Sequence, residues 1–212
     1  MRCRSEIVTH CRPVTRLSMT ARLVVTCGED CTLTVIRLLT DGAVMVSHVL
    51  QGHVSRVRCV SIDGLRLLSG SDDRSAKLWS VRGRGGGAAT TTLAGHVWPV
   101  CQVELAGSLA LTADTRSLRL WSVPAGQLLR NITGVSSQQV RLDLAAGCIF
   151  VTGETNNLLC FTLADTDTAA WQTVTASTPA KSGARLCVGH STLLLLSALT
   201  NSIHINIIDF LN

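Results

Sequence analysis

The amino-acid sequence predicts an all-β protein built from repeated four-stranded units. Apolar segments of strand length alternate with short polar turns, and no long window shows helical periodicity. Two motifs also recur at nearly the same interval: Gly52-His53 and Gly95-His96 are 43 residues apart, and Trp79 and Trp121 are 42 apart. A Gly-His opening and a tryptophan close with a period of about 40–45 residues indicate one four-stranded sheet per repeat.

Composition favours one folded domain with an ordinary core. The chain has 212 residues, of which 46% are hydrophobic and 16% charged, and its net charge is +5. Lys77 and Lys181 are the only lysines, so arginine supplies nearly all of the positive charge. Arginine suits carboxylate and phosphate partners. A modest surplus spread along the chain, however, does not by itself predict nucleic-acid binding.

Compartment and membrane association follow from the cysteines and the apolar runs. The nine cysteines are odd in number and form no recurring close pairs, and the N-terminus lacks the apolar region of an export signal. We therefore expect free thiols and a cytoplasmic or nuclear location. No apolar run is long enough to cross a bilayer, so we expect no membrane partner.

A hairpin of an apolar strand, a polar turn and an alternating strand recurs along the whole chain. Its five turns are expected at 29–30, 72–73, 114–115, 155–156 and 200–201. Inner strands that lead into the hairpins are predicted at 54–62, 97–105 and 140–144. Outer strands are predicted at 6–9, 44–50, 90–93, 127–132 and 171–174.

One glycine-rich segment, Val81 to Thr90, interrupts the pattern. It has neither a following helix nor the Gly-Lys-Ser/Thr of a phosphate-binding loop. We interpret it as a surface connection, with contact to nucleic acid as the alternative for an Arg-Gly segment.

The Gly-His and tryptophan motifs, with the phrase from Leu67 to Trp79, resemble the WD-repeat (WD40) family and its F-box/WD members. The resemblance implies a β-propeller with about five recognisable blades, either a closed small ring or a fragment of a seven-bladed ring. Residues 1–212 would then form one domain, with repeat units near 9–51, 52–94, 95–133, 134–176 and 177–212. An outer strand at 6–9 could close the ring against the last hairpin, which removes an open sheet edge.

The family resemblance also implies a hydrogen-bonded tetrad in each blade. The second repeat matches it in full, with His53, Ser69, Asp73 and Trp79. The first keeps His10, Thr26 and Asp30, with Ile36 in the place of tryptophan. The third keeps His96 and Trp121 but has Thr115 at the aspartate position, Asp114 one residue early and Leu111 at the Ser/Thr position. The last two repeats lack the tetrad.

These His-Asp-Ser sets look like hydrolytic triads, but their repetition and the tryptophan favour a structural role. Cys27 and Cys31 lack a second ligand pair at metal spacing. We expect no catalytic residue, no metal and no cofactor.

The resemblance places peptide binding on the face that carries the Gly-His connections and the aspartate turns. The positions implied here are Arg56, Arg58 and Asp72 in the second repeat, Glu29 in the first, and Pro99 and Cys101 with the neighbouring Trp98 in the third. Two arginines that alternate on one strand point to the same side and would suit an acidic or phosphorylated peptide. Ordinary solvated arginines are the alternative.

The resemblance therefore predicts a non-catalytic scaffold for protein or peptide partners. The substrate-recognition subunit of an F-box type ubiquitin ligase is an alternative, because of the phrase at Leu67 to Trp79. An RNA-associated scaffold is another, because of the arginines and the glycine-rich loop.

Overall fold

Five antiparallel sheets make up the computed structural model, which describes residues 7–40, 42–82, 89–134, 139–143, 148–152, 158–162, 185–188, 192–199 and 202–209. The first three sheets have four strands each, and we call them the first, second and third blades. The first comprises β1 (Val14–Met19), β2 (Leu23–Gly28), β3 (Thr32–Leu38) and β4 (Val44–Gln51). The second comprises β5 (Val57–Asp63), β6 (Arg66–Ser71), β7 (Ala76–Ser80) and β8 (Ala89–Leu93). The third comprises β9 (Gln102–Ala106), β10 (Leu109–Ala113), β11 (Ser117–Ser122) and β12 (Gln127–Thr133).

Two three-stranded sheets follow. They comprise β13 (Gln139–Asp143), β14 (Cys148–Thr152) and β15 (Leu158–Thr162), and then β16 (Arg185–Val188), β17 (Thr192–Leu199) and β18 (Ser202–Asp209). The described residues contain no helix, and hence none that is long and apolar enough to cross a membrane.

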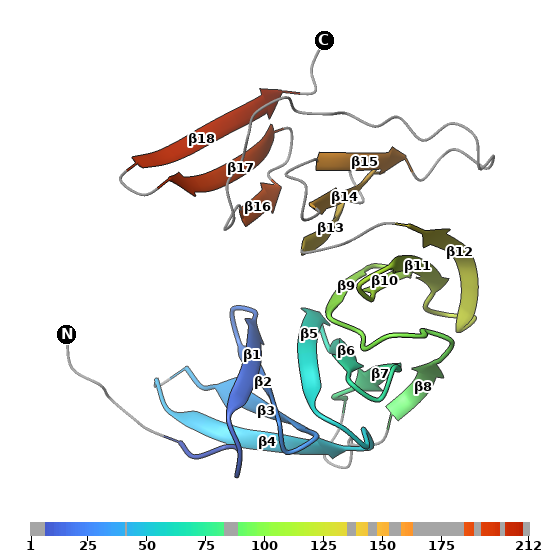
Figure 1. Cartoon of the computed structure of the whole chain (residues 1–212). Coiled ribbons are helices and arrows are strands. Elements are labelled where there is room, and N and C mark those ends of the chain that lie inside the picture. The colour runs from blue at the N-terminus through green and yellow to red at the C-terminus, as the bar shows by residue number, and fades with distance from the viewer. Residues whose placement is uncertain are drawn as a thin grey trace.

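The sheets follow one another around a common centre (Figure 1). In each sheet, the strands lie side by side in their sequence order, and neighbouring strands are antiparallel. Inner strands contact the inner strand of the next sheet: β1 contacts β5, β5 contacts β9, β9 contacts β13, and β13 contacts β16. This radial arrangement of β-sheets is the propeller that the sequence predicts.

The repeat is visible in backbone irregularities as well as in sequence. The pairing of the third and fourth strands shifts register at Val35/Ile36, Leu78/Trp79 and Leu120/Trp121, which are equivalent places in three blades. Cys31 and Arg74, 43 residues apart, are the two non-glycine residues with positive φ in the described chain, both at 66°. The first two hairpin turns therefore have the same strained conformation.

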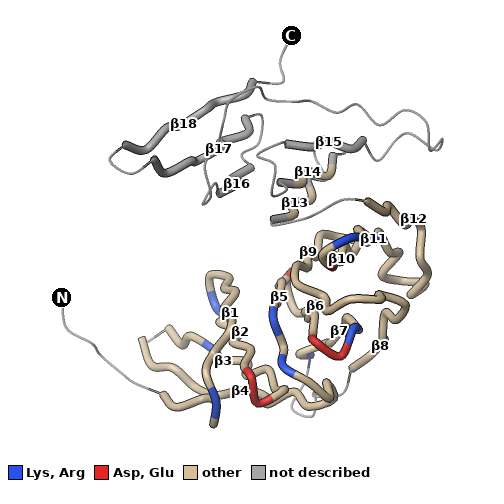
Figure 2. The backbone as a smooth tube through the Cα atoms, viewed as in Figure 1, with Lys and Arg blue, Asp and Glu red and all other residues tan. Residues whose placement is uncertain are grey.

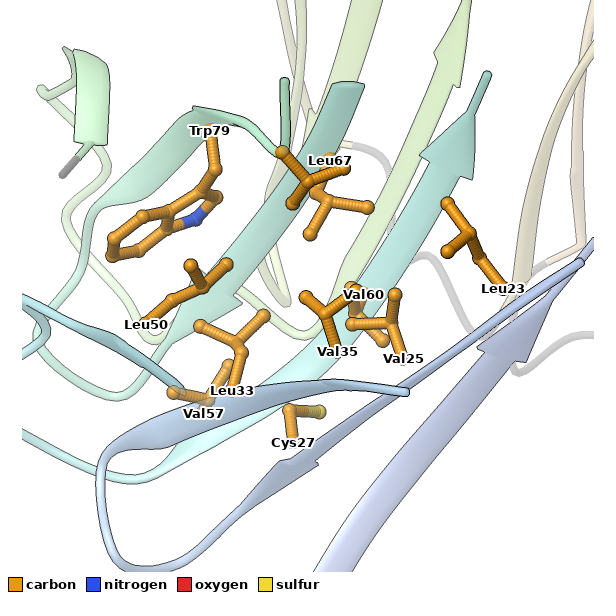
Figure 3. Close-up of a cluster of buried hydrophobic side chains, with 11 residues drawn as sticks. Leu23, Val25, Cys27, Leu33, Val35, Leu50, Val57, Val60, Leu67 and Trp79 are labelled. Carbon is orange, nitrogen blue, oxygen red and sulfur yellow. The ribbon is translucent and has the colours of Figure 1, made fainter. Parts of the chain in front are cut away.

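Hydrophobic cores lie between successive sheets rather than within them. Figure 3 shows the core between the first and second blades, where Leu33 and Val35 of β3 face Leu67 of β6 and Trp79 of β7. Similar cores join the second blade to the third and the third to β13 and β14. A single sheet exposes both of its faces, so stacking against neighbours is what stabilises each one.

The predicted strands need three corrections. The inner strands β5 and β9 begin at Val57 and Gln102, later than expected, because the residues before them form the connections between blades. Residues 7–9, expected to be an outer strand, are not in a strand, and residue 6 lies outside the described residues. The strand expected at 171–174 also lies outside them, as does most of the glycine-rich segment, residues 83–88. The repeat boundaries and the closure of the ring stay predictions.

Candidate partner-binding face

The connections between blades and the turns between second and third strands lie on one face, which we call the histidine face. It comprises residues 9–12, 29–31, 52–56, 71–75, 95–101 and 114–117. Backbone N–H groups join its parts: Val54 N donates to the side-chain Oδ2 of Asp73 at 3.2 Å, and Val100 N donates to the Ser71 carbonyl oxygen at 3.0 Å. The second of these links the third blade to the turn of the second, so the face is continuous across blades.

The tetrad of the second blade forms as predicted. His53 Nδ1 lies 2.7 Å from Asp73 Oδ2, and His53 Nε2 lies 2.8 Å from Ser69 Oγ. Trp79 Nε1 donates to the same Ser69 oxygen at 2.8 Å. One arrangement of the hydrogen atoms satisfies all four side chains. The Trp79 indole N–H donates to Ser69 Oγ, the Ser69 hydroxyl donates to His53 Nε2, and His53 Nδ1–H donates to the Asp73 carboxylate.

The pKa shifts agree with a neutral His53 and an ionised Asp73. Burial lowers the pKa of His53, although Asp73 opposes the shift. Burial also opposes ionisation of Asp73, but hydrogen bonds from Ser75 and His53 outweigh it and lower the pKa of Asp73. The network is therefore a fixed chain of hydrogen bonds that anchors the connection to the turn. No group in it is left free to act as a nucleophile.

The first blade keeps the histidine part of the network. His10 Nδ1 lies 3.0 Å from both oxygens of Asp30, and His10 Nε2 lies 2.9 Å from Thr26 Oγ1. Burial opposes ionisation of Asp30, but hydrogen bonds from His10 and Thr32 lower its pKa to about 2. Ile36 offers no donor to Thr26, as the sequence predicts.

In the third blade His96 and Trp121 occupy the expected places, but the positions expected for the aspartate and the Ser/Thr were wrong, and the tetrad is complete. His96 Nδ1 lies 2.8 Å from Asp114 Oδ2, His96 Nε2 lies 2.7 Å from Thr112 Oγ1, and Trp121 Nε1 donates to Thr112 Oγ1 at 2.8 Å. Thr115 is exposed and Leu111 is a buried core residue.

A shorter turn explains the error. Four residues, 114–117, separate the paired residues Ala113 and Leu118. Five residues, 71–75, separate the equivalent pair in the second blade, Gly70 and Ala76. Deleting one residue shifts the serine/threonine position relative to the tryptophan, and the aspartate moves to the first position of the turn.

The candidate binding residues of the first two blades form one cluster of alternating charges. Arg56 Nε donates to Asp72 Oδ2 at 3.0 Å, and Arg56 Nη1 donates to Glu29 Oε1 at 3.2 Å, across the blade boundary. Arg58 also forms an ion pair with Asp72. Figure 2 shows the basic stretch of β5 between the acidic turns that precede β3 and β7. We call these four residues the charged cluster.

The two arginines do converge on one side, but they are already paired. All four side chains stay partly exposed, from 21% for Asp72 to 39% for Arg58. The hydrogen bond that Arg56 donates to Glu29 and the negative charge of Asp72 raise the pKa of Arg56. Because two carboxylates balance two guanidinium groups, an incoming anion would have to compete with Asp72 or Glu29.

The third-blade residues lie in the connection that precedes β9. Trp98 is 44% exposed, Pro99 is half-buried, and Cys101 is half-buried with its thiol 3.4 Å from the Ala113 carbonyl oxygen. The guanidinium of Arg116 lies 5.3 Å from the centre of the Trp98 ring, a cation–π distance. Trp98 is therefore held in place on the histidine face by a neighbouring turn.

A pocket of about 590 Å³ lies next to Trp98 and was not predicted from the sequence. Its walls include Val97, Arg116, Arg119 and Thr133. No sequence motif predicts this pocket, because its walls come from separate parts of the third blade: the connection before β9, the shortened turn, β11 and β12.

Metal and thiol chemistry find no support in the described part of the chain. Cys27 and Cys31 are free thiols, and the described residues contain no group of three or more His, Cys, Asp or Glu side chains placed to hold a metal ion. Burial raises the pKa of Cys27 and, more strongly, of Cys59, so neither thiol is activated.

Comparisons with known proteins agree with this geometry. A family model described as "WD domain, G-beta repeat" matches residues 45–80, which span β4 to β7. The chain is 30% identical over 134 residues to the DENN domain and WD repeat-containing protein SCD1 of Arabidopsis thaliana, covering 59% of the chain and 11% of SCD1. It is 27% identical over 108 residues to the F-box/WD repeat-containing protein mec-15 of Caenorhabditis elegans, covering 46% of the chain and 25% of mec-15. The chain thus spans a quarter or less of the length of these relatives.

Among solved structures, two computationally designed proteins share the fold. Ika8 has a TM-score of 0.74 at 17% identity and covers 96% of this chain and 60% of its own. Ika4 has a TM-score of 0.65 at 19% identity and covers 74% of this chain and 96% of its own. At these identities the likeness concerns the fold alone.

Proposed function

Because this chain belongs to the WD40-repeat family, we propose that it is a non-catalytic scaffold that holds a protein or peptide partner on its histidine face. The family generally mediates protein interactions through non-catalytic propellers. The observation that supports this face in particular is the charged cluster of Glu29, Arg56, Arg58 and Asp72.

The cluster spans two blades and has no net charge. A partner of mixed charge suits it, with an acidic residue that reaches the arginines and a basic residue that reaches the carboxylates. Trp98, exposed on the same face, supplies the aromatic contact that often dominates protein interfaces.

Affinity capture tests the proposal. The tagged chain and its Arg56→Gln/Arg58→Gln variant are used to isolate partners, which mass spectrometry identifies. Glutamine is chosen instead of glutamate because two glutamates beside Glu29 and Asp72 would place four carboxylates together. Arg66→Gln is the matched control, since Arg66 pairs with Asp63 at 2.9 Å in the same sheet but at the opposite end of the strands. We expect the double variant to lose partners that the control retains. Identical partner sets from all three proteins would contradict the proposal.

A second candidate is substrate recognition within an F-box type ubiquitin ligase. The similarity to mec-15 supports it, although that alignment covers 25% of mec-15. Under this proposal, ubiquitin-ligase subunits accompany the captured partner, and the partner's ubiquitination falls when the chain is depleted. Capture without ligase subunits, with unchanged ubiquitination, would exclude this candidate and leave the scaffold proposal intact.

A further inference from the structure

The pocket beside Trp98 contains a guanidinium, that of Arg119, for which the described residues supply no ion-pair partner. Arg119, on β11, lines the pocket, and none of the ion pairs of the described residues includes it. Its Nε is buried, and it is the only buried side-chain nitrogen or oxygen of the described residues without a hydrogen-bond partner. A buried donor without a partner is costly, so this side chain gains more from a bound anion than the paired Arg56 would.

The acidic residue in the pocket wall is already engaged elsewhere. Asp114 Oδ2 lies 2.8 Å from His96 Nδ1 and accepts from Ser117 Oγ at 2.8 Å. Asp114 Oδ1 accepts from the backbone N–H groups of Arg116 and Ser117, both at 2.7 Å. Its charge is therefore directed at the tetrad, and the pocket keeps the positive charge of Arg116 and Arg119.

The guanidinium of Arg119 lies close against Gly95. Gly95 has a φ of +119°, and a Cβ built on it would collide with the guanidinium of Arg119. Glycine at this position therefore leaves space for the arginine as well as allowing the backbone conformation.

We propose that this pocket binds an oxyanion on a peptide segment of a protein partner, with an apolar neighbour of that residue packed on Trp98. Arg119 would pair with the anion inside the pocket, and Arg116 would do so at its rim while stacked on the Trp98 ring. The inference rests on the proposed partner-binding function and adds a second site, on the third blade. An acidic or phosphorylated residue of the partner would then have a second place to bind, separate from the charged cluster.

The pocket is tested with three short peptides and fluorine NMR. The peptides are acetyl-Gly-Leu-X-Leu-Gly-amide with X as glutamate, phosphoserine or glutamine, and the protein is labelled with 5-fluorotryptophan. The Trp98→Phe variant assigns the Trp98 signal. We expect saturable shifts of that signal by the glutamate or the phosphoserine peptide, with a Kd of about 1 mM or tighter, and at least tenfold weaker binding of the glutamine peptide. Whichever of the two anionic peptides has the lower Kd shows whether the pocket prefers a carboxylate or a phosphate.

Substitutions test whether the anion binds inside the pocket. Arg119→Gln should weaken the anionic peptide about tenfold or more, whereas Arg22→Gln, which removes an exposed charge at the opposite end of the strands, should not. Equal binding of the glutamine peptide, no saturable shift, or unchanged binding to Arg119→Gln would overturn the proposal. So would a shift by oligouridine in the absence of any peptide effect.

The charged-cluster variant separates the two proposals. Arg56→Gln/Arg58→Gln should bind the anionic peptide normally if the pocket acts as proposed, whatever the result of partner capture. Loss of peptide binding in that variant would overturn the pocket as a separate site.

Discussion

Arg56 of the second blade donates to Glu29 of the first at 3.2 Å, so the charged cluster is a product of how two blades pack. Asp72 lies on the other side of Arg56 and also holds Arg58. The four residues proposed to bind a partner are thus an ordered, ion-paired set rather than independent solvated side chains.

The charged cluster should matter little for stability. Because its side chains are partly exposed and their ion pairs are screened by solvent, Arg56→Gln/Arg58→Gln should leave the urea midpoint of unfolding nearly unchanged. Urea denaturation of the variant beside the unmodified chain checks this. A clear fall in the midpoint would mean that the variant cannot separate binding from folding.

The tetrad of the second blade should contribute far more. Asp73→Ala leaves His53 Nδ1 without its acceptor and frees the connection that Val54 N anchors. We expect a loss of about 2–4 kcal/mol in the free energy of unfolding. Asp72→Ala, one residue earlier in the same turn, is the control and should cost about 1 kcal/mol or less. Equal losses for the two variants would show that His53 does not need the aspartate.

The revised third-blade tetrad makes a separate prediction. Thr112→Val keeps the shape of the side chain but removes the acceptor of Trp121 Nε1 and the partner of His96. It should lower stability by about 1–3 kcal/mol. Thr115→Val, at the exposed position that the sequence suggested, should change it by less than about 0.5 kcal/mol. Thermal or urea unfolding decides the point, and a larger effect at Thr115 would restore the original assignment.

Stability should fall as the pH decreases below about 6.5. Burial lowers the pKa of His53 and of His96 in the folded chain, so between those values and about 6.5 the unfolded chain binds more protons. The aspartates act in the same direction below about pH 4, because the folded-state pKa values of Asp73 and Asp30 are lowered, for Asp30 to about 2. Urea midpoints measured from pH 8 to pH 5 should decrease below about 6.5. A constant midpoint over this range would contradict neutral, buried histidines.

The sequence was sufficient for the elements that depend on local pattern. The Gly-His openings, the hairpin turns and the tryptophans are repeated at fixed spacing, and each has a direct structural cause. Gly52 illustrates this, since its φ is +155° and a Cβ there would lie 3.2 Å from the Trp79 ring. The tetrads of the first two blades could be assigned from the family resemblance because these blades keep the spacing that it implies.

The remaining features depend on packing between blades or on a change in turn length. A one-residue deletion in the turn places Thr112 one residue nearer to Trp121 than expected, and Asp114 occupies the first position of that turn instead of the third. The pairing of Arg56 depends on Glu29 from another blade, so the pair could not be inferred from alternation along one strand. Arg119 lies two residues before Trp121, where the second repeat has Lys77, and its place in the repeat gives no sign of the pocket. Only the folded third blade places it in a pocket beside Trp98.

Hydrogen–deuterium exchange of the chain with and without a captured, purified partner tests the central claim most directly. We expect protection on the histidine face, at residues 52–56, 71–75 and 95–101, with the turns at the opposite ends of the strands, residues 64–65 and 107–108, unchanged. Protection confined to those opposite turns would contradict the claim that partners are held where the histidines and aspartates join the blades.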